Sequence, residues 1–185
     1  MNYLRIPSFA SADAVHVVVE SPRGSTVKLK YDPALEAFGV SRPLPEGLVY
    51  PYDWGFVPST RASDGDPLDV MVVWDRPSFP GVVLTCRLLG VVAAEQNNKQ
   101  HRERRERNDR LIALPLEAPR QEAIESIDDL PVRMREELES FFVATVAFEH
   151  KDLTFLGWSG VSAAYDLVRS CLTGTDAERI ETRSR

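Results

Sequence analysis

The chain has 185 residues, of which 43% are hydrophobic and 27% charged, and its formal net charge is −6. These values suit one soluble globular domain over residues 1–185, they argue against a largely disordered chain, and the acidic balance argues against a general nucleic-acid binder. No stretch approaches the roughly 20 apolar residues needed to cross a bilayer, and the N-terminus lacks the pattern of a signal peptide, so we expect a cytoplasmic protein with reduced cysteines.

The first two-thirds of the chain have the pattern of β-strands. Runs of β-branched and apolar residues, separated by turn-forming residues, predict strands at 15–20, 26–31, 35–40, 68–74, 82–94 and 111–114. The Pro- and Gly-rich stretch before the fourth strand holds four alternating aromatics that an extended backbone would place on one face: Tyr50, Tyr52, Trp54 and Phe56. Short strands without intervening helices favour a small barrel over a parallel α/β sheet.

The last third has a helical pattern instead. Apolar residues recur at helical spacing over 132–148, after an acidic and proline-containing start signal, and a second helix is predicted over 162–172. The residues after Gly174, 174–185, are expected to form a frayed tail. The sequence therefore predicts an α+β protein, mainly β, with at least two C-terminal helices outside a barrel.

The most informative segment is the acidic turn at 64–69, Asp-Gly-Asp-Pro-Leu-Asp. Gly65 permits a tight turn, and Pro67 pushes Asp66 into an extended conformation. In the strand that follows, Asp69 shares a face with apolar Met71, where a carboxylate is costly unless it is paired or metal-bound. No basic residue lies between residues 61 and 76, so a hard cation such as Mg²⁺ would supply the missing charge. A solvated turn with an edge-facing Asp69 is the alternative.

This turn resembles the Asp-x-Asp-Pro-hydrophobic-Asp signature of the family I soluble inorganic pyrophosphatases. Further segments match the family in the same order: 17–22, 40–42, 50–58, 80–81, 90–91, 111–115, 128–131, 141–142, 151–153 and 157–158. The resemblance covers about residues 15–172. It implies an OB-like five-stranded β-barrel with helices packed outside, Mg²⁺-dependent hydrolysis of pyrophosphate with Mn²⁺ as a substitute metal, and homo-oligomers that are commonly hexameric in bacteria.

The resemblance also implies roles for individual residues. Four acids match metal-site positions: Glu20, Asp64, Asp66 and Asp69. Asp66 also matches the base that helps to deprotonate the attacking water, a chemistry that metal binding promotes. Four donors match groups that hold the substrate phosphates: Lys28, Arg42, Tyr50 and Lys151. Read alone, the basic residues among these donors are equally typical of solvated surface positions.

Two further metal-site aspartates of the family are replaced in this chain. They align with Gln96 and Asn108, which bring oxygen ligands but no charge. A one-residue slip would restore Glu95 and Asp109, but in a strand it would turn them to the other face unless a bulge re-aims them. We therefore favour Gln96 and Asn108 at these positions.

Three other family positions are also changed. Lys30 stands where the family has a glutamate, so a metal-binding charge has become a repelling one. Arg110 replaces a lysine, and His150 replaces a tyrosine as a neighbour of the phosphate-contact lysine. These changes reduce the negative charge of the metal site or alter a phosphate donor, and they leave the level of turnover open.

A basic segment interrupts the acidic protein within a loop at 96–109 that is much longer than the family's usual one. Residues 99–110 carry a net charge of +3, against −3 for residues 1–98 and −6 for residues 111–185. One interpretation is a flexible, solvated run of charges. The other is a cationic lid that binds phosphate or grips a larger substrate such as a nucleotide, for which arginine's bidentate fork is suited.

Three functions follow from these observations. The first is a divergent Mg²⁺-dependent hydrolase that splits pyrophosphate, or a related phosphorylated small molecule, into phosphates. The second is a catalytically degenerate homologue that binds pyrophosphate or a nucleotide without efficient turnover. The third is an OB-fold nucleic-acid module, which the acidic remainder of the chain disfavours. We expect the hydrolase, without a membrane or nucleic-acid partner.

Overall fold

The computed structural model describes residues 2–98, 101 and 103–173, so the tail expected at 174–185 and two basic residues of the loop, Lys99 and Arg102, lie outside the described residues. The strands are β1 (Phe9–Ser11), β2 (Ala14–Ser21), β3 (Val27–Asp32), β4 (Ala37–Pro43), β5 (Asp53–Val57), β6 (Leu68–Val72), β7 (Val83–Asn97), β8 (Arg105–Arg107), β9 (Arg110–Pro115) and β10 (Thr154–Ser159). The α-helices are α1 (Val132–Thr145) and α2 (Val161–Ser170), and short 3-10 helices cover Tyr3–Arg5, Pro119–Gln121 and Ile127–Asp129.

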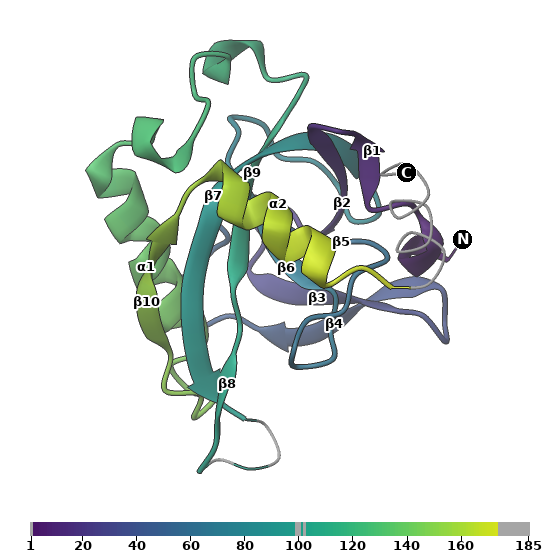
Figure 1. Cartoon of the computed structure of the whole chain (residues 1–185). Helices are drawn as coiled ribbons and strands as arrows, with labels where there is room; N and C mark the ends of the chain where they lie inside the picture. The colour runs from purple at the N-terminus through teal and green to yellow at the C-terminus, as the bar shows by residue number, and fades with distance from the viewer. Residues whose placement is uncertain (1, 99–100, 102, 174–185) are drawn as a thin grey trace.

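Five strands close into a barrel in the order β2-β5-β6-β9-β7, because β7 also pairs with β2. All of these pairings are antiparallel except that of β6 with β9. Strand β7 extends beyond the barrel and pairs there with β8 and β10, while β3 and β4 form a separate hairpin. Both α-helices lie outside the barrel (Figure 1). The predicted mainly-β barrel with C-terminal helices is confirmed.

Each predicted strand and helix is present, with shifted ends. The helix predicted over 132–148 ends at Thr145, where a series of turns begins. Strands β1, β5 and β10 were not predicted, and neither was β8, which lies inside the segment expected to be a plain loop. Strand β8 forms because it pairs with the end of β7, and the local sequence gives no sign of this pairing.

Three of the four alternating aromatics, Tyr50, Tyr52 and Trp54, pack in one cluster, and Phe56 packs in another. Tyr50 precedes β5, and it packs with Trp54 in the cluster that includes Phe142 of α1. Phe56 belongs to another cluster, with Val18. Trp54 and Phe56 are two residues apart in the regular strand β5, so they lie on one face as expected, although they pack in different clusters.

The alternation predicted for β6 is confirmed. Leu68, Val70 and Val72 pack in one core cluster with residues of α2. Met71, on the opposite face, packs in the second cluster with residues of α1. Asp69 lies on the Met71 face at the start of β6, next to the acidic turn. The barrel therefore holds the turn rigidly at the end of a strand with two buried faces.

Within the described part of the chain, no helix is both long and apolar enough to span a membrane.

The contact between β2 and β5 requires a glycine. A Cβ atom at Gly55 would lie 2.0 Å from the carbonyl oxygen of Val18, a backbone atom that cannot move without breaking the sheet. We expect Gly55→Ala to lower the free energy of unfolding by about 3 kcal/mol. Urea denaturation would measure this.

The matched control is Gly39→Ala in β4, where an added Cβ meets nothing within 4 Å. Its effect should stay within about 0.5 kcal/mol. Equal stability of the two variants would contradict the packing argument.

Candidate active site

Three adjoining hollows open between the β3–β4 hairpin, the acidic turn and the segment after α1. Two lysines, Lys28 and Lys151, line all three of them. The first hollow, of about 230 Å³, holds Glu20 and the three aspartates of the turn. The second, of about 460 Å³, includes His150. The polar residues predicted from distant parts of the sequence therefore meet in one continuous depression.

The acidic turn presents three carboxylates to the first hollow. Gly65 has φ of 87°, a left-handed conformation suited to glycine. Asp64 Oδ1 accepts a hydrogen bond of 3.1 Å from the amide of Asp66, which fixes the turn. Burial raises the pKa of Asp69, and the nearby charges of Lys28 and Arg110 counteract this only in part.

Glu20 adds a fourth carboxylate from the neighbouring strand β2. Its side chain is buried, and its Oε1 accepts a hydrogen bond of 2.7 Å from the amide of Tyr31. Burial raises the pKa of Glu20 to about 7, the Tyr31 amide lowers it, and the charge of Asp69 raises it. Two carboxylates with raised pKa values thus face one hollow, where a positive charge would stabilise their ionised forms.

Lys30 supplies one positive charge, but it pairs with Asp66, the more exposed of the carboxylates, and not with Glu20 or Asp69. Its Nζ lies 2.8 Å from Oδ2 of Asp66, and both side chains are partly exposed. Burial lowers the pKa of Lys30, but the hydrogen bond and charge of Asp66 outweigh this effect, so that the net shift is upward. The carboxylate expected to act as the base is therefore paired with a resident ammonium group.

The four residues expected to donate hydrogen bonds to the substrate phosphates line the same depression. Lys28 and Arg42 are cross-strand partners on the β3–β4 hairpin. Arg42 Nε is 3.5 Å from Oε1 of Glu149, and Tyr50 is buried against the ring of Phe141. Burial raises the pKa of Tyr50, so its hydroxyl stays protonated and can donate.

Glu95 and Asp109, which a register slip would have placed in the site, are held elsewhere. Glu95 Oε1 accepts from Arg105 at 3.1 Å. Asp109 accepts from Arg107 at 2.8 Å and from the amide of Ala94 at 3.0 Å. The register of β7 is the same against β8 and against the start of β9, so no bulge re-aims these side chains. Neither carboxylate lines the three hollows.

Of the two amides that replace family aspartates, Asn108 lines the hollows and Gln96 does not. Asn108 lines the first and third hollows together with Asp69. Gln96 is fully buried, its Nε2 lies 3.4 Å from Oε1 of Glu106, and its Oε1 has no hydrogen-bond partner in the described structure. Gln96 is absent from the lining of all three hollows.

Glu106 lies next to the buried Gln96, but like Glu95 and Asp109 it does not line the three hollows. It pairs with Gln96 across β7 and β8, two residues before Asn108 in a continuous register. Arg110 is buried, its guanidinium lies 4.9 Å from the centre of the Phe142 ring, and its Nη1 donates to the carbonyl of Asn108. Burial lowers the pKa of Arg110, and the charge of Asp69 offsets this only in part.

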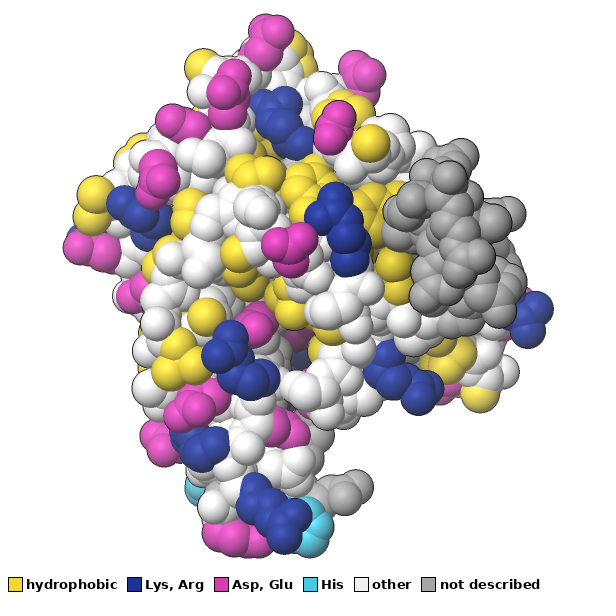
Figure 2. Space-filling model, in the orientation of Figure 1, with side chains coloured by type: hydrophobic (Ala, Val, Ile, Leu, Met, Phe, Trp, Pro, Cys, Tyr) yellow, Lys and Arg dark blue, Asp and Glu magenta, His cyan; other side chains and the backbone are white. Residues whose placement is uncertain are grey.

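Two arginines of the basic segment contact acids of the protein itself. Arg107 pairs with Asp109, and Arg105 pairs with Glu95 and Asp152. Figure 2 shows basic and acidic side chains interleaved at this end of the molecule. In the described residues, these two guanidinium groups are therefore not aimed at the hollows as a lid would require.

The donors around the first hollow suit a divalent cation. Four carboxylates and the Asn108 amide line it, and oxygen is the ligand that hard cations prefer. The described residues contain no ready-made cluster of three Asp, Glu, His or Cys side chains at metal-binding distance. The chemistry of the residues fits a divalent cation, although the acids stand apart and Lys30 occupies Asp66.

Comparisons with known proteins identify the family of the chain. The model of the inorganic pyrophosphatase family matches residues 17–175. The chain is 36% identical over 172 residues to the inorganic pyrophosphatase of Synechocystis sp., covering 93% of this chain and 98% of that one. The crystal structure of the inorganic pyrophosphatase from Thermus thermophilus superposes with a TM-score of 0.84 at 35% identity, covering 92% and 97%. The corresponding values for the Coxiella burnetii protein are 0.81, 31%, 90% and 97%.

These matches place the chain among the family I, barrel-type phosphohydrolases. It belongs to the inorganic pyrophosphatase family. Membership implies a divalent metal cofactor.

Proposed function

We propose that this protein hydrolyses inorganic pyrophosphate to two phosphates with Mg²⁺ as its cofactor. The observation that carries the proposal is that four carboxylates and four side chains able to bind phosphate line one depression. A magnesium–pyrophosphate complex needs both sets, since the cation requires oxygen ligands and the phosphates require positive donors.

The carboxylates divide into two tasks. Asp64, Asp69 and Glu20 would hold the cation, because they line the first hollow and because partial removal from water raises the pKa of Glu20 and Asp69. A bound divalent cation would make a water molecule more acidic and would neutralise phosphate charge. Asp66, which is more exposed and paired with Lys30, would accept the proton of the attacking water once Lys30 releases it.

The reaction breaks the bond between one phosphorus and the bridging oxygen. The water oxygen attacks that phosphorus, its proton passes to a carboxylate oxygen of Asp66, and the leaving phosphate takes up the electron pair of the broken bond. Lys28, Arg42, Tyr50 and Lys151 would hold the outer phosphate oxygens and stabilise the charge that develops on them. Positioning and charge stabilisation are the main needs of such a transfer.

The finer properties of the protein follow the family. We propose Mg²⁺ rather than another divalent ion, a cytoplasmic location and a homo-oligomer, with a hexamer by analogy. The unpaired state of Cys86 and Cys171 supports a reducing compartment.

The proposed base can be tested with Asp66→Asn. We expect phosphate release from pyrophosphate in the presence of Mg²⁺ to fall at least about 100-fold, because general-base catalysis contributes about that much. A colorimetric phosphate assay measures it.

Asp166→Asn on the exposed face of α2 is the matched control and should leave release unchanged. Calorimetric binding of pyrophosphate without release by the unmodified protein, with either Mg²⁺ or Mn²⁺, would overturn the proposed hydrolysis and favour the degenerate homologue.

The Lys30–Asp66 pair predicts weakened metal binding. Lys30→Gln removes an ammonium that repels the cation from beside Asp66, so calorimetry should show Mn²⁺ binding about tenfold more tightly. Arg133→Gln, which makes the same change in net charge on the exposed face of α1, should alter Mn²⁺ affinity less than twofold. Unchanged Mn²⁺ affinity in Lys30→Gln would show that Lys30 does not compete with the cation.

A further inference from the structure

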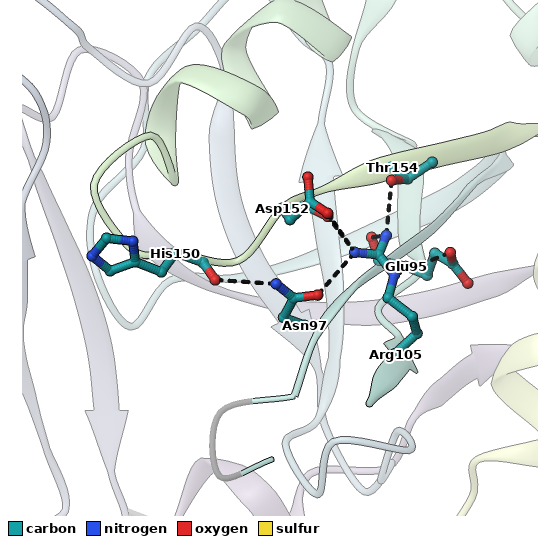
Figure 3. A network of polar contacts seen from close by, with 6 residues as sticks. All are labelled: Glu95, Asn97, Arg105, His150, Asp152 and Thr154. Atoms are coloured by element: carbon teal, nitrogen blue, oxygen red, sulfur yellow. Dashed lines mark hydrogen bonds and ion pairs between the residues drawn. The ribbon is translucent and has the colours of Figure 1, made fainter. Parts of the chain in front are cut away.

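Hydrogen bonds from the β7–β8 hairpin hold the backbone on both sides of Lys151. Three consecutive carbonyls are engaged. That of His150 accepts from Asn97 Nδ2 at 3.5 Å, and that of Lys151 accepts from the Asn97 amide at 2.6 Å. That of Asp152 accepts from Arg105 Nη1 at 2.7 Å. Figure 3 shows two of these contacts, from Asn97 to His150 and from Arg105 to Asp152, on the segment before β10.

The backbone at this place is unusual for residues with side chains. His150 has φ of 54° and Asp152 has φ of 46°, so Lys151 lies between two residues in the left-handed region. A non-glycine residue in this region is strained and stays there only when its surroundings hold it. The contacts from Asn97 and Arg105 are such surroundings.

Arg105 is the centre of this network. Its Nε donates to Glu95 Oε1 at 3.1 Å, and its Nη2 donates to Thr154 Oγ1 at 2.8 Å. Its Nη1 also reaches Asn97 Oδ1 at 3.0 Å and Asp152 Oδ2 at 3.2 Å. The planar guanidinium fork can satisfy these directions together, whereas a lysine ammonium cannot. Arg105 thus ties β7, β8 and β10 together at the point where the chain turns toward Lys151.

We propose that Arg105 is a positioning residue that fixes the backbone of Lys151 and so directs the Lys151 ammonium at the substrate phosphate. The proposal rests on the proposed function, in which Lys151 contacts pyrophosphate. It assigns a task to the basic segment: one of its arginines acts on the protein's own backbone and does not touch the substrate. The other donors reach the site without it, since Lys28 and Arg42 come from the β3–β4 hairpin.

The same strand offers a matched control. Arg107 lies two residues further along β8, and its side chain pairs with Asp109 and is 51% exposed. Removing either arginine changes the net charge by the same amount at nearly the same place. An effect confined to Arg105 is therefore not a general effect of charge near the site.

The experiment is a double-mutant cycle on the full chain. Arg105→Ala, Lys151→Ala, the double variant and Arg107→Ala are compared by three measurements: KM and kcat for pyrophosphate, calorimetric binding of a non-hydrolysable methylene diphosphonate with Mg²⁺, and the melting temperature. We expect Arg105→Ala to raise KM and the dissociation constant of the analogue about tenfold, with a smaller change in kcat. In the Lys151→Ala background the same substitution should add less than twofold, because its effect passes through Lys151.

Arg107→Ala should change both constants less than twofold. Arg105→Lys, which keeps the charge and loses the fork, should resemble Arg105→Ala, and it replaces that variant in the cycle if Arg105→Ala does not fold. Equal effects of the Arg105 substitution with and without Lys151 would overturn the proposal, as would an unchanged analogue affinity in Arg105→Ala. Either result leaves the proposed function standing, whereas absence of pyrophosphate hydrolysis by the unmodified protein would remove the function itself.

Discussion

Strand β7 makes the hydrogen bonds on which both the barrel and the site depend. Its first half pairs with β2 and β9 and closes the barrel, and its second half pairs with β10 and β8 beyond it. Closure removes the free edges that an open sheet would expose. The same strand fixes where β9, the Lys151 segment and the basic segment lie relative to the acidic turn. A change in its register would therefore alter the core and the site together.

The site concentrates negative charge that the barrel does not neutralise. Strands β2 and β6 place Glu20 and Asp69 where they lose contact with water, and this loss raises the pKa of both carboxyls. Lys28 and Arg110 offset part of this charge, while Lys30 pairs with the more exposed Asp66. A site of this kind is unfavourable for folding alone and favourable for a cation, which is why buried carboxylates without full partners indicate function.

The basic segment shows how charge in a sequence can mislead. Its net charge of +3 suggested a lid that binds phosphate. Two of its arginines instead pair with acids from three places in the chain: Glu95, Asp109 and Asp152. A count of charges cannot reveal this, because the partners of Arg105 are brought to it only by strand pairing. Among the described residues, Arg105 and Arg107 and the acids around them neutralise each other locally.

The sequence alone determined the mainly-β fold and the composition of the acidic turn. The turn is a local feature, since Gly65, Pro67 and the alternation of β6 follow from backbone sterics and the period of a strand. The tertiary structure decided which carboxylates reach the hollows. Glu95 and Asp109 carry carboxylates like the residues that line the hollows, and the unbroken register of β7 against β8 and β9 keeps them out of the lining. It also decided the partners of Glu106 and Arg105, because hydrogen bonds between residues distant in the chain depend on how the strands pair, which no local pattern encodes.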